Sequence, residues 1–235
     1  MAARTNKNSI PTMFNQKAKK DGEILFTGLH ITTEHTGKME GMYSLSTTAK
    51  MNPWCELKAQ NIHLICHYCY AEKMLGQYKD LEKNLESNTE ILTSTVLPKE
   101  LLPIINAHSF RFEAFGDLIN TTQVKNYFNI CRKNKEVHFT IWTKNAWIIR
   151  QALEEGEKKP RNLIIIFSSP IVNKAFDLAK IQKVWPFVDK VFTVYDSEEA
   201  AEQAGVQINC GGRKCITCLN CYRKGGQNVI NELKK

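Results

Sequence analysis

The sequence predicts an α/β protein whose strands form a partial (βα)6 barrel, similar to an incomplete TIM barrel. Two observations support this prediction. From residue 110 onward, short runs rich in β-branched and aromatic residues alternate with segments that carry apolar residues at helical spacing. The 235 residues accommodate about five or six such βα units, fewer than the eight of a complete barrel. A doubly wound open sheet is the alternative architecture.

Short apolar runs mark the expected strands, and apolar residues that recur every three or four positions mark the helices. The expected strands are 42–47, 110–114, 137–142, 163–167 and 190–195. The expected helices are 121–131, 145–156, 172–179 and 196–205. A further helix is expected over 90–107, where Pro98 and Pro103 interrupt it. Cys131 lies on the apolar stripe of its helix, so we expect it to be an inert core thiol.

Composition and charge exclude several classes of protein. The chain is 43% hydrophobic and 24% charged, which is typical of a globular protein rather than a disordered one. Residues 1–23 are polar and carry no secretory signal, and no apolar run approaches the roughly 20 residues that span a membrane. We therefore expect a cytoplasmic protein without a membrane partner. A formal charge of +8 suits anionic partners, but no nucleic-acid recognition motif accompanies it.

Three regions are expected along the chain. Residues 1–40 form an N-terminal extension, residues 41–205 form the partial barrel, and residues 206–235 form a cysteine-rich C-terminal extension. Seven of the eight cysteines fall in two groups, one in each of the last two regions. In a reducing compartment, such clustered thiols are typical of metal sites rather than of disulfides.

The first cysteine group consists of Cys55, Cys66 and Cys69. Cys66 and Cys69 are three residues apart, so one turn of chain directs both sulfurs toward one metal centre, while Cys55 arrives from a separate loop. Three thiolates leave one coordination position open, as a catalytic site requires. His63 or His67 would close that position and turn the group into a structural zinc site.

The second cysteine group places four thiols within twelve residues, at Cys210, Cys215, Cys218 and Cys221. The last three lie at i, i+3 and i+6, a spacing more typical of iron–sulfur ligation than of zinc. Zinc remains the alternative, since four cysteines also satisfy a tetrahedral zinc site. The sequence therefore predicts two metal sites, one open and one closed.

Polar residues collect where the expected strands end, the edge at which parallel sheets carry active sites. Glu113, Gly116 and Asp117 lie at the end of one strand, Lys144 follows the next, and Ser168 follows a third. Helix capping explains many polar residues at such positions, but the helix after Asp117 starts only four residues further on. We expect Asp117 and Lys144 to be catalytic, and Asp117 and Ser168 to bind a cofactor or ligand.

The order of these motifs resembles that of the phage and prophage "gene product 88" family. The resemblance covers about residues 40–223 and implies a phage-type protein located in the host cytoplasm. The motifs that carry it are Cys55, Cys66-x2-Cys69-Tyr-Ala, Arg-Phe-Glu-Ala-Phe-Gly-Asp at 111–117, Phe-Thr-Ile-Trp-Thr-Lys-Asn at 139–145 and Cys215-x2-Cys218-x2-Cys221-Tyr.

A wider similarity is to radical S-adenosylmethionine enzymes. It implies that Cys55, Cys66 and Cys69 hold a [4Fe–4S] cluster and that Gly116-Asp117 contacts a ligand amine. The chain departs from that family in two ways. Ten residues separate the first two cysteines instead of three, and aspartate stands where glutamate is usual.

Together these expectations describe an iron–sulfur protein with two [4Fe–4S] clusters. The open iron would take a small-molecule ligand such as S-adenosylmethionine, and an electron donor would serve it. Two alternatives stay open. One is a zinc-stabilised basic module that binds nucleic acid, and the other is an electron-transfer protein without catalytic activity.

Overall fold

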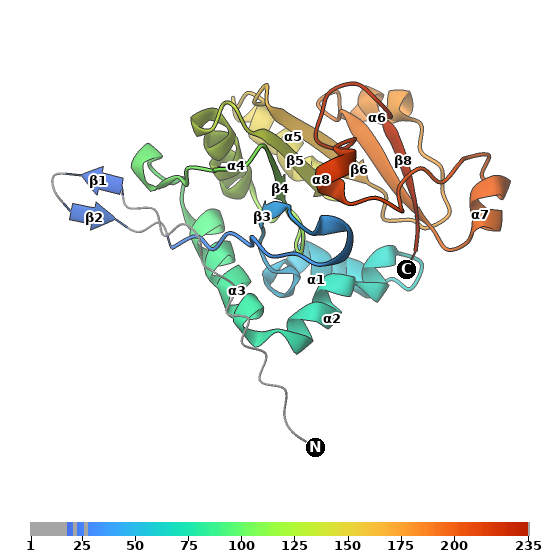
Figure 1. The fold of residues 1–235 in the computed structure, drawn as a ribbon, viewed down its shortest axis with the longest axis horizontal. Helices are drawn as coiled ribbons and strands as arrows, with labels where there is room; N and C mark the ends of the chain where they lie inside the picture. Colours follow the sequence, from blue (N-terminus) through green and yellow to red (C-terminus); the bar gives the residue numbers. More distant parts are fainter. Residues whose placement is uncertain (1–17, 21–22, 26–27, 235) are drawn as a thin grey trace, which may run out of the picture.

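The structure, a computed structural model, describes residues 18–20, 23–25 and 28–234 (Figure 1). Its centre is a six-stranded sheet in which every strand pairs in parallel with its neighbour. The strands follow chain order without reversal, whereas a doubly wound sheet reverses its order. The strands are β3 (Tyr43–Leu45), β4 (Ser109–Phe112), β5 (His138–Thr143), β6 (Leu163–Ser168), β7 (Lys190–Tyr195) and β8 (Val229–Leu233). The predicted mixed α/β class is thereby confirmed.

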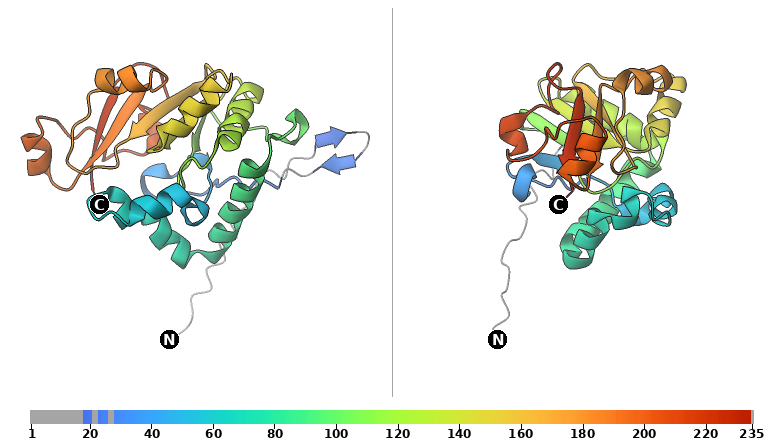
Figure 2. Two further views of the ribbon diagram at one scale, coloured as in Figure 1. Left: turned by 180° about the vertical axis from the view of Figure 1, so that it is seen from behind. Right: turned by 90° about the vertical axis from the view of Figure 1, so that its right-hand side faces the viewer.

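Helices that connect the strands cover one face of the sheet, as Figures 1 and 2 show from opposite sides. They are α4 (Thr121–Lys133), α5 (Ala146–Glu154) and α6 (Leu178–Val184). Their apolar residues, including Tyr127 and Ile149, form the main core with alternate strand residues such as Phe110 and Phe139. Cys131 is fully buried in this core, as its place on the helical stripe predicts.

The opposite face of the sheet is covered by the cysteine-rich C-terminal segment. Ile164, Ile166 and Ile230 form a second apolar cluster there, against which Cys210 and Cys221 pack. The segment predicted as an extension is therefore packed along the sheet, and it ends in β8, the sixth strand.

The chain between β3 and β4 forms a helical layer at the carboxyl ends of the strands. It contains α1 (Pro53–Ala59), η3 (Ile65–Tyr68), α2 (Tyr70–Gln77) and α3 (Lys79–Ser94). Lys234, which follows β8, lies over the Tyr68 ring at 4.7 Å from its centroid. The remaining short elements are β1 (Ala18–Lys20), β2 (Glu23–Leu25), η1 (Gly37–Met39), η2 (Ala49–Met51), η4 (Lys99–Leu101), α7 (Glu198–Gln203) and α8 (Cys215–Cys218).

The five predicted strands are all present, but two predicted helices are wrong. The helix expected over 172–179 begins only at Leu178, because Asn173 adopts a left-handed φ of 61° and its side chain accepts a hydrogen bond from the Asp196 backbone. The helix expected over 90–107 is the end of α3 followed by a single 3-10 turn. The Asn126 side chain holds the intervening backbone open by bonding to Thr95 and Leu97.

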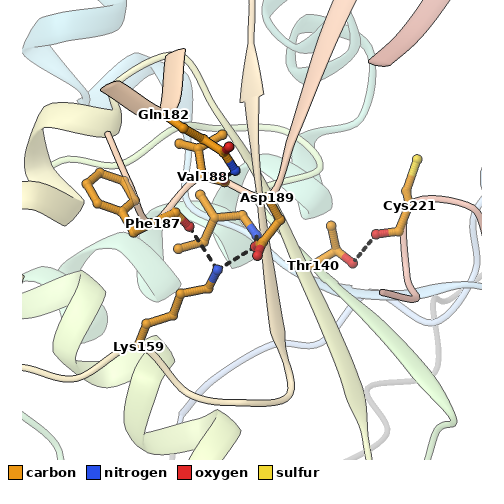
Figure 3. A network of polar contacts seen from close by, with 8 residues as sticks. Thr140, Lys159, Gln182, Phe187, Val188, Asp189 and Cys221 are labelled. Atoms are coloured by element: carbon orange, nitrogen blue, oxygen red, sulfur yellow. Dashed lines mark hydrogen bonds and ion pairs between the residues drawn. The ribbon is translucent and has the colours of Figure 1, made fainter. Parts of the chain in front are cut away.

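Polar contacts join the strands at their amino ends (Figure 3). The Lys159 ammonium donates to the Phe187 carbonyl at 2.8 Å and to the Asp189 carboxylate. That carboxylate also accepts from the Ile165 backbone at 2.7 Å, so it links β6 to the chain entering β7. On the far side of the sheet, Thr140 donates to the Cys221 carbonyl at 3.0 Å.

Within the described residues, no helix has both the length and the apolar character needed to cross a membrane.

Candidate functional site

Cys55 lies in the first turn of α1, whose start is fixed by Asn52 as the N-cap residue and by Pro53. Pro53 takes the first helical position, and the Asn52 side chain accepts hydrogen bonds from the Trp54 and Cys55 backbones at 3.0 and 3.4 Å. The same side chain donates to the Asp117 carbonyl at 3.0 Å. Asn52 therefore fixes Cys55 beside the end of β4. Asn52 is a positioning residue that was not predicted, although an Asn-Pro pair is a recognisable signal for the start of a helix.

Cys66 lies in η3 and Cys69 directly precedes α2. The loop is attached above β6, because the Ile65 backbone donates to the Pro170 carbonyl at 2.9 Å. The Tyr70 hydroxyl donates to the Ala114 carbonyl just after β4. These contacts hold the first cysteine group over the carboxyl ends of two strands.

Cys55 and Cys66 lie within electrostatic reach of Asp117 and Lys144, and both also lie within reach of the Cys69 thiol. Burial raises the pKa of Cys55 well above its usual range, and the Asp117 carboxylate and the Cys69 thiol raise it further. The Lys144 ammonium opposes that shift. Burial also raises the pKa of Cys66, where Lys144 again opposes and Asp117 adds to the shift. Thiols with raised pKa values are neutral near pH 7, so a metal would displace their protons on binding.

Asp117 is 4% exposed and joins the ends of β4 and β5. One carboxylate oxygen accepts from the Leu118 backbone at 2.8 Å and from the Thr143 hydroxyl. The other accepts from the Lys144 backbone at 2.9 Å. Within the described residues, these bonds occupy three of the about four acceptor positions of a carboxylate, which leaves one position on the second oxygen.

Glu113 forms a separate buried network behind this site. Its backbone has a left-handed φ of 55°, and its carboxyl accepts from the Tyr127 hydroxyl, from the Gln123 amide at 2.7 Å and from the Thr47 backbone at 3.2 Å. Complete burial raises its pKa to about 8, despite these donors. The strand-end pattern drew attention to Glu113 but gave no sign that its side chain points into the interior.

Gly116 packs against this network. A Cβ at this position would lie 2.6 Å from both the Glu113 carboxylate and the Thr47 carbonyl. Glycine is therefore required here by close packing of the backbone.

Replacing Gly116 by alanine is expected to lower the free energy of unfolding by about 1–3 kcal/mol, because the added methyl overpacks a buried site. Urea denaturation of both proteins measures the difference. Gly76→Ala is the matched control, since a Cβ on this α2 residue meets no atom within 4 Å. Equal stability of Gly116→Ala and the parent protein would contradict the packing role.

The other predicted residues of the first site are placed as follows. Ser168 ends β6 and is 5% exposed, and within the described chain no contact joins its side chain to the cysteines. The His67 Nδ1 lies 2.7 Å from the Ala59 carbonyl. A carbonyl only accepts, so this contact assigns the proton to Nδ1 and leaves Nε2 as the nitrogen available to a metal.

The second cysteine group lies on the face of the sheet that the helices leave uncovered. Cys215 and Cys218 are the first and last residues of α8, and Cys210 pairs with Glu232 beside β8. Burial raises the pKa of Cys221 to about 12, and the neighbouring thiols of Cys210 and Cys215 add to the shift.

Arg111 supplies positive charge to this second group. Its guanidinium lies over the Trp142 ring at 4.1 Å from the centroid and lowers the pKa of Cys215 and Cys221 against the effect of burial. Arg111 also donates to the Glu113 carbonyl at 3.4 Å. Arg111 therefore favours thiolates in the second group. It begins the motif at 111–117, but nothing in the sequence indicates this role.

The thiols of both cysteine groups are the kind of donor that binds zinc or an iron–sulfur cluster. All seven are free thiols of intermediate exposure, and the side chains within each group influence one another's charge. Among the described residues, no three His, Cys, Asp or Glu side chains converge closely enough to hold a single metal ion.

Comparison with known proteins gives one match. The model of the family described as "Gene product 88" matches residues 4–234. No curated protein and no solved structure matches the chain. The family match spans nearly all of the sequence and confirms the resemblance seen in the cysteine and strand-end motifs. The chain therefore belongs to the gene product 88 family.

Proposed function

We propose that this chain is an iron–sulfur protein whose first cysteine group holds a [4Fe–4S] cluster with one iron open to a small-molecule ligand. The observation that carries the proposal is the shared electrostatic environment of Cys55, Cys66, Cys69, Asp117 and Lys144. Short elements attached above β4 and β6 bring these residues together. Three thiols with one free coordination position suit a cluster that binds a ligand.

The sheet supports this location for the site. Six parallel strands in chain order, with α4, α5 and α6 on one face, are the arrangement from which a partial (βα)6 barrel is built. In such barrels, ligands bind at the carboxyl ends of the strands. We propose that the chain is a partial barrel of this kind, with the first cysteine group at its mouth.

The residues around the first group would then act on a bound ligand. The free acceptor position of Asp117 would accept a hydrogen bond from a ligand amine, and the Lys144 ammonium would attract a carboxylate. Ser168 at the end of β6 would position the same anionic group. S-adenosylmethionine carries both an amine and a carboxylate. When bound, the cluster supplies an electron, received from a separate donor, and a coordination position for the ligand.

The second cysteine group would hold an auxiliary [4Fe–4S] cluster. Its four thiols leave no position open, and Arg111 offsets part of the negative charge that the thiolates would introduce. Because thiol-ligated clusters persist in reducing surroundings, we propose that the protein works in the cytoplasm.

Incubation of the anaerobically prepared, reduced protein with S-adenosylmethionine tests the proposed ligand. We expect methionine and 5′-deoxyadenosine to form, and Cys66→Ala to form neither. If the protein with both clusters neither binds nor cleaves S-adenosylmethionine, the ligand assignment is wrong and an electron-transfer role is favoured.

A further inference from the structure

A cavity of about 300 Å³ opens at the end of the sheet away from the first cysteine group. His138 at the start of β5 and Asn162 and Ile164 at the start of β6 form one side. Tyr222, Arg223 and Lys224 of the C-terminal segment form the other side. The first cysteine group lies at the carboxyl ends of the strands and this cavity at their amino ends, so the two are distinct sites.

The cavity is lined by positive charge without a neutralising carboxylate. Its lining includes the cations of Arg161, Arg223 and Lys224, together with His138, and it includes no aspartate or glutamate. Within the described part of the chain, Arg161 and Arg223 make no ion pair, whereas Arg132 and Arg150 each pair with a glutamate. Unpaired guanidinium groups that face one cavity attract an anion, and their planar donors suit phosphate in particular.

Hydrogen bonds from Lys190 fix the segment that carries Arg223 and Lys224. Lys190 is 1% exposed, and its ammonium donates to the carbonyls of Asn220, Gly225 and Gln227 at 2.8, 3.1 and 3.1 Å. The buried Lys190 ammonium thus holds the loop of residues 220–227 in one conformation. Thr140 attaches Cys221, two residues before Arg223, to the sheet (Figure 3).

The opposite wall is equally well anchored. The Asn162 side chain donates to the carbonyls of Cys131, Asn134 and Val137, each at 3.0 Å. Its neighbour Arg161 is therefore presented from a fixed backbone. Because both walls are already fixed, less conformational entropy is lost when a ligand binds.

Apolar side chains complete the cavity. Ile164 belongs to the apolar cluster on this face, and the buried Tyr222 ring packs against Trp142 with centroids 5.7 Å apart. A ligand in this cavity would meet cations on the rim and an aliphatic and aromatic floor. We propose that the cavity binds a phosphorylated small molecule, with Arg161 and Arg223 on the phosphate and the body of the ligand against Ile164 and Tyr222.

Isothermal titration calorimetry of the full chain, as purified, tests this site. The probes are inorganic pyrophosphate, glucose 6-phosphate and adenosine 5′-monophosphate, with adenosine as the unphosphorylated counterpart. We expect at least one phosphorylated probe to bind, adenosine to bind more weakly than its monophosphate, and added salt to weaken phosphate binding. Arg161→Gln and Arg223→Gln should each weaken it by about tenfold to a hundredfold, because each removes a charge-assisted contact.

Arg150→Gln is the matched control, since it removes an arginine that pairs with Glu154 outside the cavity. It should leave binding unchanged, and thermal unfolding should show that all three variants fold. The proposal is overturned if no phosphorylated probe binds at millimolar concentration, or if Arg161→Gln and Arg223→Gln leave binding unchanged. Binding of a single-stranded oligonucleotide without binding of any small phosphate probe would also overturn it, in favour of a nucleic-acid surface.

Discussion

Under the proposed iron–sulfur function, replacing Cys66 by alanine is expected to remove half of the iron and labile sulfide and to leave the other half in place. Cys66 belongs to the group over the carboxyl ends of β4 and β6, whereas the second group lies on a face of the sheet. Loss of one of three thiolates leaves two, too few to hold a cluster with an open iron. Absorption and electron paramagnetic resonance spectra of anaerobically prepared protein measure the remaining cluster.

Cys131→Ala is the control for this experiment, because it removes a thiol that is fully buried in the main core. It should leave the iron content unchanged while costing on the order of 1 kcal/mol of stability. Loss of both spectral signals in Cys66→Ala would show that the two cysteine groups form one shared site. An unchanged iron content would show that Cys66 is not a ligand.

Glu113 is expected to make the protein less stable as the pH rises from about 4.5 to about 8. The pKa of its buried carboxyl is raised to about 8 from a usual value of 4.5, so the folded protein holds this proton more tightly than the unfolded chain does. The stabilisation of the folded protein by the proton on Glu113 is complete below about pH 4.5, and it is lost as the pH rises to and past about 8. The loss is on the order of a few kcal/mol in the free energy of unfolding.

Urea denaturation of the parent protein and of Glu113→Gln across this pH range measures the effect, since the amide cannot titrate. The difference between the two unfolding free energies should shift in favour of the variant as the pH rises. Glu90→Gln, at an exposed position on α3, is the control variant. A difference for Glu113→Gln that does not change with pH would contradict the raised pKa of Glu113.

Much of the fold was predictable because local sequence determines it. The strands β4 to β7 are short apolar runs, and α4 and α5 carry their apolar residues at regular helical spacing. The candidate site followed from the rule that parallel strands end at one edge, which brings Asp117 and Lys144 to the same cysteines. These features depend on periodicity and on sheet geometry, and both can be read from a single sequence.

The features that were not predictable depend on tertiary contacts. In β8, Asn231 and Glu232 interrupt the apolar pattern, so only pairing with β7 identifies it as a strand. The burial of Glu113 depends on donors from Thr47 and Tyr127, which are distant in the sequence. The basic cavity likewise joins residues of β5 and β6 to the C-terminal segment.

Metal and sulfide analysis of anaerobically purified protein is the most direct test of the proposed iron–sulfur function. We expect iron and acid-labile sulfide in equal amounts, in the quantity that two [4Fe–4S] clusters require, with little zinc. Zinc in stoichiometric amount without labile sulfide would contradict it and would favour two structural zinc sites formed by the same cysteines.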